Sequence, residues 1–221
     1  MTDRTAVLVS GGLDSCVMLV MLTRPAQRVS PVYVKCGLVW ESEELERLDA
    51  FLQAVAHPRI DPVQVLDLPM SDVYGGLWHS SGAGIPGYHE PDERWEIPGR
   101  NLVLLVKAAV WCRLNSVGSI ALGILGTNPF SDATPEFFEG LEHTLSRGLD
   151  FPLRLLRPLA GMSKAEVIRL GRDLPLELTL SCAESRAGVH CGVCGKCKER
   201  IDAFAESGVP DPTAYAAPPP V

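Results

Sequence analysis

A glycine-rich loop between two apolar runs constrains this chain more than any other feature of its sequence. AVLVS at residues 6–10 has the composition of a buried strand, and SCVMLVMLT at residues 15–23 has that of a buried helix. The motif SGGLDS, Ser10 to Ser15, joins them. Glycines let the backbone approach a ligand closely, and the start of a helix offers free N–H groups and the positive end of its dipole. The arrangement therefore predicts a strand–loop–helix cradle for phosphate groups.

The loop also predicts which residues bind a nucleotide and its metal ion. It is not a Walker A loop, because the chain's one Gly-Lys pair lies near the C-terminus and is followed by cysteine. An acidic side chain in a phosphate cradle would repel the ligand unless a Mg²⁺ ion lay between them. The predicted nucleotide-binding residues are Val9, Ser10, Gly11, Gly12, Leu13, Asp14 and Ser15.

Strand-like runs alternate with helix-like runs along most of the chain. Such alternation predicts an α/β fold with a doubly wound, mostly parallel sheet and helices on both faces. Ligands of such sheets bind at the carboxyl ends of the strands. Further strands are expected over residues 30–36, 63–68, 119–124 and 152–159, and further helices over residues 41–55, 101–114, 134–148 and 163–174.

Two segments carry more specific expectations. Residues 71–99 are rich in Gly, Pro and His, so we expect a long loop, and loops of that length are usually functional. The helix over residues 101–114 is apolar nearly all round, which predicts that it is buried.

Four cysteines close together near the C-terminus predict a metal site. Their spacing, C-x8-C-x2-C-x2-C, lets four thiolates converge on a zinc ion in a closed, structural site. An iron–sulfur cluster remains an alternative. The ligands would be Cys182, Cys191, Cys194 and Cys197. We therefore expect a nucleotide-binding domain over residues 1–175, a zinc-binding segment with a C-terminal helix over 176–207, and a flexible tail over 208–221.

Composition narrows the class of protein. A net charge of −7 argues against broad electrostatic binding to nucleic acid. No apolar run approaches the length of a membrane-spanning helix, and the first residues do not resemble a signal peptide. The expectation is a cytoplasmic protein that binds neither a membrane nor nucleic acid.

The order of several motifs resembles one family. With the glycine loop and the cysteine cluster in place, the chain resembles the 7-cyano-7-deazaguanine synthase branch of the PP-loop ATPases, whose fold is adenine nucleotide alpha hydrolase-like. The further motifs are IPGRN at residues 97–101, DATPEF at residues 132–137, which resembles the family's D-C-R-P-E-F, and SKAEVIRLG at residues 163–171.

The resemblance implies an activity and its participants. Such an enzyme is an ATP-dependent ligase that converts 7-carboxy-7-deazaguanine and ammonia to a nitrile. The acid becomes an acyl adenylate, ammonia gives the amide, and a second ATP activates the amide oxygen. The implied cofactors are ATP, Mg²⁺ and Zn²⁺, and relatives suggest a homodimer.

The resemblance also implies roles for single residues. Ser10, Gly11, Gly12 and Ser15 would cradle pyrophosphate, and Asp14 would hold magnesium. Lys164 would neutralise phosphate, and Arg100 would face phosphate or the activated carboxylate. Asn101 would cap its helix or orient the loop. Asp132 would accept hydrogen bonds from the guanine-like edge of the substrate.

Departures from the family pattern leave alternatives open. DATPEF lacks the family's Cys and Arg, and GLVWE stands at residues 37–41, where the family carries Gly-Gln-Arg-His. A paralogue that stops at the amide, or that joins a deazapurine acid to another amine, is the main alternative. Less favoured are a tRNA sulfurtransferase, opposed by the net acidity, and a non-enzymatic zinc module, for which Lys196, Lys198 and Arg200 are the best support.

Overall fold

A five-stranded parallel sheet organises the protein. The computed structural model describes residues 4–23 and 27–220. The strand order is β3-β2-β1-β4-β5, and every neighbouring pair is parallel. The chain leaves β1 toward β2 and β3 on one side and toward β4 and β5 on the other, so the sheet is doubly wound about β1. The strands are β1 Arg4–Leu8, β2 Arg28–Lys35, β3 Gln64–Asp67, β4 Ser119–Ala121 and β5 Arg154–Leu156.

The long helices form where periodicity and end signals predicted them. Thr134 caps α6 by accepting a hydrogen bond from the Phe137 N–H, and Ser163 and Glu166 form a reciprocal capping box at α7. The helices are α1 Leu13–Met21, α2 Glu41–Val55, α3 Ser71–Tyr74, α4 Trp78–Ser81, α5 Arg100–Leu114, α6 Pro135–Gly148, α7 Lys164–Leu170 and α8 Gly195–Ser207. The predicted fold class is confirmed.

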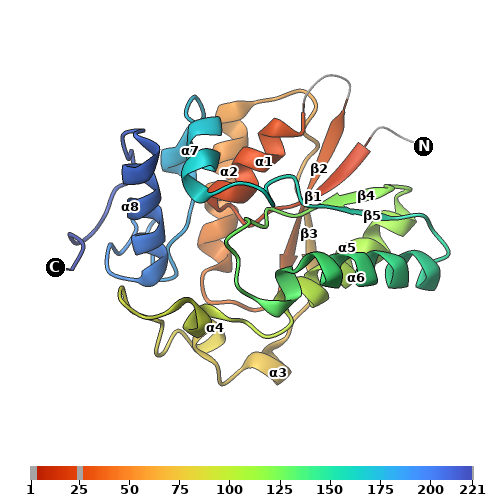
Figure 1. The fold of residues 1–221 in the computed structure, drawn as a ribbon, viewed down its shortest axis with the longest axis horizontal. Helices are drawn as coiled ribbons and strands as arrows, with labels where there is room; N and C mark the ends of the chain where they lie inside the picture. The colour runs from red at the N-terminus through yellow and green to blue at the C-terminus, as the bar shows by residue number, and fades with distance from the viewer. Residues whose placement is uncertain (1–3, 24–26, 221) are drawn as a thin grey trace.

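Alternate residues of β1 bury themselves on opposite faces of the sheet. Ala6 and Leu8 belong to a core with α5 and α6, whereas Val7 and Val9 belong to a second core with α1, α2, α7 and α8. Figure 1 shows α5 and α6 on one side of the strands and α1 and α7 on the other. Because both faces are covered, the strands read as continuous apolar runs.

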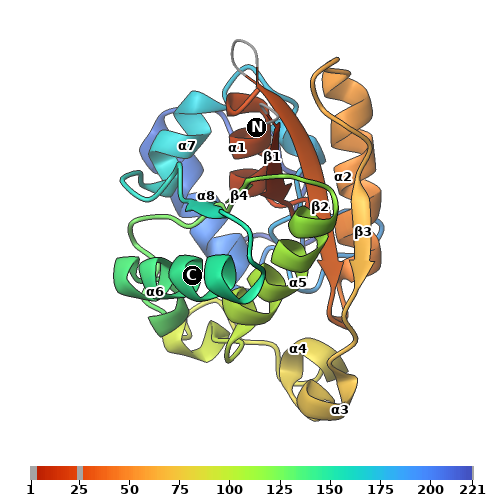
Figure 2. The same ribbon diagram turned by 90° about the vertical axis from the view of Figure 1, so that its right-hand side faces the viewer.

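The segment between β3 and α5 is not the single long loop that its composition predicted. It contains α3, α4 and a 3₁₀ turn at Asp92–Trp95. Figures 1 and 2 show α3 and α4 beyond the carboxyl end of β3. Each helix is a single turn, too short for periodicity to show in the sequence. Trp78 and Trp95 pack edge to face, with ring centroids 5.2 Å apart, so this segment folds on its own aromatic side chains.

Helix α5 is only partly buried, contrary to the prediction from its apolar sequence. Leu102, Val106, Val110 and Leu114 are 40, 41, 44 and 78 % exposed. They recur every four residues, so they share one face of the helix. The opposite face already fills the core against the sheet. Among the described residues, no helix is both long and apolar enough to span a lipid bilayer.

The C-terminal residues as far as Ala216 are packed against the protein, where the sequence predicted a flexible tail. The His190 N–H donates to the Ala214 carbonyl over 3.1 Å, and the Ala216 N–H donates to the His190 carbonyl over 2.8 Å. Arg200 Nε also donates to Thr213 Oγ1 over 2.7 Å. These partners are far away in sequence, so local composition did not reveal them. Val221 lies outside the described residues.

Candidate functional site

The glycine loop turns sharply between β1 and α1. Gly11 has φ +69°, and a Cβ there would lie 2.5 Å from the backbone carbonyl oxygen of Glu44. Only glycine fits this conformation and this contact. The Ser10 side chain accepts a hydrogen bond from the Gly12 N–H over 3.3 Å, and the Ser15 hydroxyl donates to the Gly12 carbonyl over 3.1 Å. The loop is thus held rigidly against α2, as a ligand cradle requires.

A cavity of 350 Å³ opens over this loop. We call it the phosphate cavity. Its walls include Asp14 of the loop, Lys164 at the start of α7, Arg100 at the start of α5 and Glu199 of α8. The structure therefore brings together three residues that the sequence assigned to phosphate chemistry: Asp14, Arg100 and Lys164.

Lys164 forms the centre of a charge cluster in the phosphate cavity. Its Nζ donates to Asp14 Oδ2 over 3.1 Å and to Glu199 Oε1 over 2.7 Å. Burial alone would lower the pKa of Lys164, but the two carboxylates outweigh burial and hold that pKa above its ordinary value. Burial would raise the pKa of Glu199, yet Lys164 and Lys196 lower it to about 2. Lys164 therefore carries a positive charge at neutral pH.

Asp14 keeps one carboxylate oxygen free for a ligand. Its Oδ1 is buried and has no hydrogen-bond partner among the residues that the structure describes. An unpaired buried carboxylate oxygen costs free energy unless a cation or a donor reaches it. A hard divalent cation prefers such an oxygen ligand, so the residue fits the predicted magnesium role.

A second cavity, of 190 Å³, lies at the carboxyl ends of β1, β2 and β4. We call it the strand-end cavity. Its apolar walls include Leu8, Val34, Leu104 and Ile124, and polar side chains line the rest of it. It lies at the place where the sheet winds in two directions, the usual ligand site of such folds. Arg100 lines both cavities, and its buried Nε has no partner among the described residues.

Two acids at the start of α2 complete the site, and the sequence reading missed both. The Glu41 carboxylate accepts hydrogen bonds from the N–H groups of Cys36, over 2.6 Å, and Gly37, over 3.1 Å. Glu44 is 8 % exposed and accepts a hydrogen bond from the Tyr33 hydroxyl over 2.5 Å. In the sequence they belong to an acidic first turn, which ordinarily lies in solvent. Their spacing of three, which places both on one helix face, was the available signal.

The pKa of the Glu44 carboxyl group lies close to neutral pH. Burial raises the pKa of its carboxyl, and the neighbouring Arg100 and Tyr33 offset part of that rise, leaving the pKa at about 7. A carboxyl group with this pKa can exchange a proton in either direction under cellular conditions.

A third cavity, of 110 Å³, has tryptophan walls. We call it the tryptophan cavity. Trp40, Trp78 and Trp95 line it together with Glu44 and Arg100. These two residues also line the phosphate cavity, so the pair lies where the two cavities meet.

Asp132 and Asn101 pair with each other rather than lining these cavities together. The Asp132 carboxylate accepts hydrogen bonds from the Asn101 backbone N–H over 2.9 Å and from the Asn101 side-chain amide over 3.1 Å. Asp132 is therefore a cap for the start of α5 and is not among the residues that line the three cavities. Asn101 lines the strand-end cavity.

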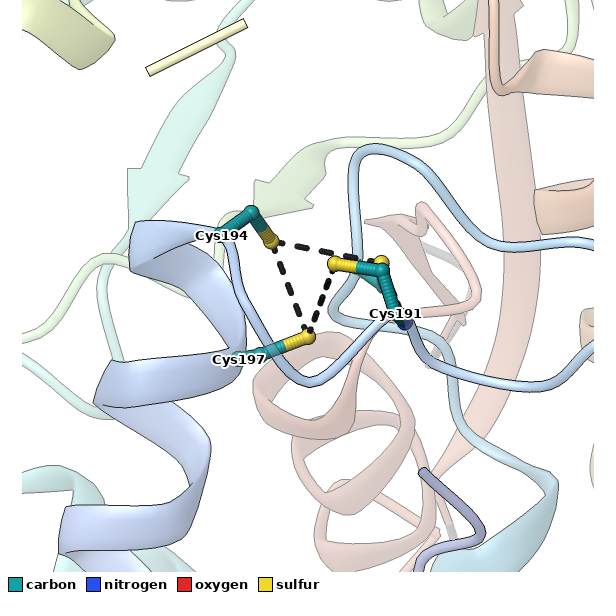
Figure 3. Close-up of side chains that lie close together, drawn as sticks. Cys191, Cys194 and Cys197 are labelled. Carbon is teal, nitrogen blue, oxygen red and sulfur yellow. Dashed lines mark hydrogen bonds between the residues drawn. The ribbon is translucent and has the colours of Figure 1, made fainter. Parts of the chain in front are cut away.

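The four cysteines converge as a metal site requires. Their sulfur atoms all lie within 4.8 Å of one another, and Figure 3 shows three of them facing a common centre. The Cys194–Cys197 and Cys191–Cys197 sulfur distances are 3.6 and 3.8 Å. Sulfurs bound tetrahedrally to zinc lie about 3.8 Å apart. Backbone N–H groups donate to these sulfurs, for example from Cys191 to Cys182 Sγ over 3.2 Å, which favours the thiolate form.

The metal segment is joined directly to the glycine loop. The Leu180 N–H donates to the Gly11 carbonyl over 2.8 Å, two residues before the first cysteine of the cluster. Trp95 packs on the first residue of α8, since a Cβ at Gly195 would lie 2.7 Å from its Nε1. The cysteine cluster thus holds one wall of the site in position.

The basic residues near the cluster do not form a free cationic surface. Arg200 is fully buried, and its guanidinium donates to the Thr179 hydroxyl over 2.9 Å and to the Leu176 carbonyl over 2.8 Å. Lys196 pairs with Glu199. These residues therefore do not support a zinc module that binds nucleic acid.

The cysteines outside the cluster are core residues. Cys16, Cys36 and Cys112 are all buried, and burial raises the pKa of each thiol. A raised pKa keeps a thiol in its unreactive form. These residues are therefore poorly suited to the nucleophilic role that sulfur transfer would need.

Comparison with known proteins identifies relatives over nearly the whole chain. A family model described as "Queuosine biosynthesis protein QueC" matches residues 4–208. A 7-cyano-7-deazaguanine synthase of Methanothrix thermoacetophila is 32% identical, over 96% of this chain and 98% of that protein. The protein of the same name from Magnetococcus marinus is 31% identical over 96% of each chain. That from Marinobacter nauticus is 30% identical, over 97% of this chain and 98% of the relative.

Proposed function

The chain belongs to the QueC family of queuosine biosynthesis proteins, and from this premise we propose that it is an ATP-dependent ligase that makes 7-cyano-7-deazaguanine from 7-carboxy-7-deazaguanine and ammonia. One observation carries the proposal: the glycine loop, Lys164 and Arg100 surround a single cavity. That arrangement suits a reaction in which two anions, a nucleoside triphosphate and a carboxylate, must be held together.

ATP would occupy two of the cavities. The strand-end cavity suits the adenine ring, because its apolar walls offer packing area for an aromatic base. The pyrophosphate would lie against the N–H groups at the start of α1, with Ser10 and Ser15 beside it. Arg100 lines both cavities, so its guanidinium would lie near the α-phosphate between them.

The reaction needs AMP because a carboxylate oxygen is a poor leaving group. A carboxylate oxygen of the acid attacks the α-phosphorus, and the bond to pyrophosphate breaks. Ammonia then adds to the acyl carbon, the carbon–oxygen bond to AMP breaks, and the amide remains. The amide oxygen attacks a second ATP, and loss of AMP with two protons from nitrogen leaves the nitrile. Arg100 and Lys164 would offset the charge that develops at phosphate.

The two metal ions have different roles in this proposal. The unpaired Oδ1 of Asp14 would hold Mg²⁺, which supplies charge neutralisation for the phosphates. The four cysteines would hold Zn²⁺ in a closed site, since four thiolates fill a tetrahedral coordination sphere. The zinc would act on structure, through the segment that carries Leu180 to the glycine loop.

Mass spectrometry of a complete reaction tests the proposal. Purified protein with ATP, Mg²⁺, 7-carboxy-7-deazaguanine and ammonium should release AMP and yield the nitrile. Lys164→Met should lower kcat by about 10²–10³-fold, because it removes a cation from the developing phosphate charge. Lys107→Met, on α5 and outside the three cavities, is the matched control and should leave kcat unchanged. Absence of any product from the acid would refute the assignment.

A second candidate is a relative that stops at the amide or joins the acid to another amine. Two observations favour keeping it. Thr134 stands where the family motif carries arginine, and it serves as a helix cap. Asp132 is paired with Asn101. The same experiment discriminates, because amide that accumulates and never becomes nitrile would support this candidate.

A further inference from the structure

Glu44 is one of two described residues, the other being Arg100, that line all three cavities of the site: the strand-end cavity, the phosphate cavity and the tryptophan cavity. Its own backbone carbonyl is packed against Gly11, at the distance that excludes a side chain from that glycine. A reaction between ligands in these cavities must therefore take place within reach of this residue.

The proposed reaction needs a proton acceptor at this junction. Ammonium is the dominant form of the nitrogen donor at neutral pH, and only the free base attacks an acyl adenylate. After attack, the new C–N bond leaves a positive charge on nitrogen, which must lose a proton as the bond to AMP breaks. The resident cations do not serve, because Lys164 carries its proton firmly and the guanidinium of Arg100 has donors but no acceptor.

We propose that the carboxylate of Glu44 accepts the proton that the nitrogen nucleophile loses during amide formation. This inference rests on the proposed function and names a residue for one of its steps. The nitrogen forms its bond to the acyl carbon and gives one proton to a Glu44 oxygen, and the electron pair of the breaking C–O bond leaves with AMP. The carboxylic acid then returns its proton to solvent.

The tryptophan cavity supplies a place for the nucleophile beside this carboxylate. A water-sized molecule needs roughly 10–15 Å³ of such space, and the cavity offers 110 Å³. Ammonia is about as large as water. Trp40, Trp78 and Trp95 surround this space, and aromatic walls limit competition by bulk water for the adenylate.

The groups facing Glu44 tune it for this task. Arg100 from α5 and the Tyr33 hydroxyl from β2 favour its charged form, whereas burial and Glu41 on its own helix favour the neutral form. Cys16 of α1 is also electrostatically coupled to Glu44, but it remains a neutral thiol. The resulting pKa of about 7 is near that of an effective general base at neutral pH.

Further charged groups line the cavities that Glu44 lines, namely Asp14, Asp92, Lys164, Lys196 and Glu199. Lys196 of α8 lines the tryptophan cavity and pairs with Glu199. Asp14 of α1 lines the phosphate cavity and pairs with Lys164. Lys196 and Asp14 are each paired with a group of opposite charge, and the Asp14 oxygen that the described residues leave without a partner is the one proposed to hold Mg²⁺.

Glu44→Gln tests the proposal by separating the two half-reactions. The amide can still accept the Tyr33 hydrogen bond but cannot take a proton. Acid-dependent exchange of pyrophosphate into ATP, which reports adenylation, should be unchanged. Ammonia-dependent kcat/KM should fall by about 10²–10⁴-fold. Glu46→Gln, an exposed position on the same helix, should change neither rate.

The nucleophile and the pH profile give two more readouts. Hydroxylamine is a much weaker base than ammonia, so after attack its nitrogen gives up its proton readily to water. Its reaction with the adenylate should therefore lose much less in Glu44→Gln. In the wild type, kcat/KM calculated for the free base of ammonia should rise with pH through about 7 as Glu44 loses its proton. Tyr33→Phe removes a hydrogen bond that favours the carboxylate, so this limb should move to higher pH.

Three outcomes would overturn the inference. The first is a Glu44→Gln enzyme with wild-type amide formation. The second is an equal loss of exchange and amide formation, which would indicate a role in binding ATP or in folding. The third is a wild-type protein that forms no adenylate from the acid, which would refute the proposed function as well. The first two leave that function intact, so the two failures are distinguishable.

Discussion

At the scale of single residues, the site is a balance of charges placed around one rigid loop. Lys164 lies between Asp14 and Glu199, and the negative charges of these two carboxylates keep the lysine protonated. Arg100 faces Glu44, and its buried Nε has no hydrogen-bond partner in the part of the chain that the structure describes. Buried groups with unused hydrogen-bonding capacity are costly in a protein that binds nothing. Their concentration here indicates that a polar ligand completes the network.

Asp132 offers a prediction at this scale, because its carboxylate caps α5. Asp132→Ala should lower the free energy of unfolding by about 0.5–2 kcal/mol, the usual cost of a lost helix cap. The KM for the acid should change little, since Asp132 does not line the three cavities. Chemical denaturation and steady-state kinetics measure the two quantities. A large rise in KM at unchanged stability would instead support the guanine-recognition role that the sequence suggested.

At the scale of elements, the cysteine cluster and the glycine loop are joined by direct contacts. The Leu180 N–H donates to the Gly11 carbonyl, and α8 begins at the cluster and carries Glu199 to Lys164. Arg200 ties the same helix to residues on both sides of it through four hydrogen bonds to Thr179, Ser181, Leu176 and Thr213. Loss of the metal should therefore loosen the glycine loop that lines the phosphate cavity.

Metal removal tests this coupling. Cys194→Ser should lower the metal content from one ion per chain, measured by elemental analysis, because it deletes one of four thiolate ligands. It should also lower the melting temperature and speed hydrogen exchange in the loop at residues 10–15. Cys112→Ala, a buried cysteine outside the cluster, should keep the full metal content. Slow exchange in the loop of the metal-free variant would show that the two sites are independent.

At the scale of the whole molecule, both faces of the sheet are covered, and the outer face of α5 presents an apolar stripe to solvent. The exposed stripe on α5 comprises Leu102, Val106, Val110 and Leu114. Contiguous apolar surface of this kind on a soluble domain often marks an interface. We propose that a second copy of the chain covers it, which is the arrangement that the family resemblance suggested.

The oligomeric state tests that proposal. Light scattering should give the mass of a dimer for the wild type. Val110→Glu should give a monomer with unchanged folding, because the position is 44 % exposed and a charge there disturbs only an interface. Glu136→Lys, a charge change in the first turn of α6, is a control that should remain dimeric. A monomeric wild type would contradict the prediction.

Features that depend on neighbours a few residues apart could be predicted from the sequence alone. Apolar runs, the capping signals at Thr134 and Ser163, the glycines of the loop and the spacing of the four cysteines each act within a turn or a single loop. From these the sheet, the helices, the phosphate cradle and the metal cluster could all be predicted. The resemblance to a family followed from the order of the same motifs.

Only the tertiary structure decided which polar groups meet. Lys164 and Asp14 are 150 positions apart, and no local pattern pairs them. Helix α2 carries several acids in its first turns, and only its packing against Gly11 and Tyr33 buries Glu44 while Glu46 stays exposed. Desolvation then sets the pKa of that carboxyl. The physical reason is that burial and electrostatic coupling depend on distance in space, which the fold creates and the sequence pattern does not contain.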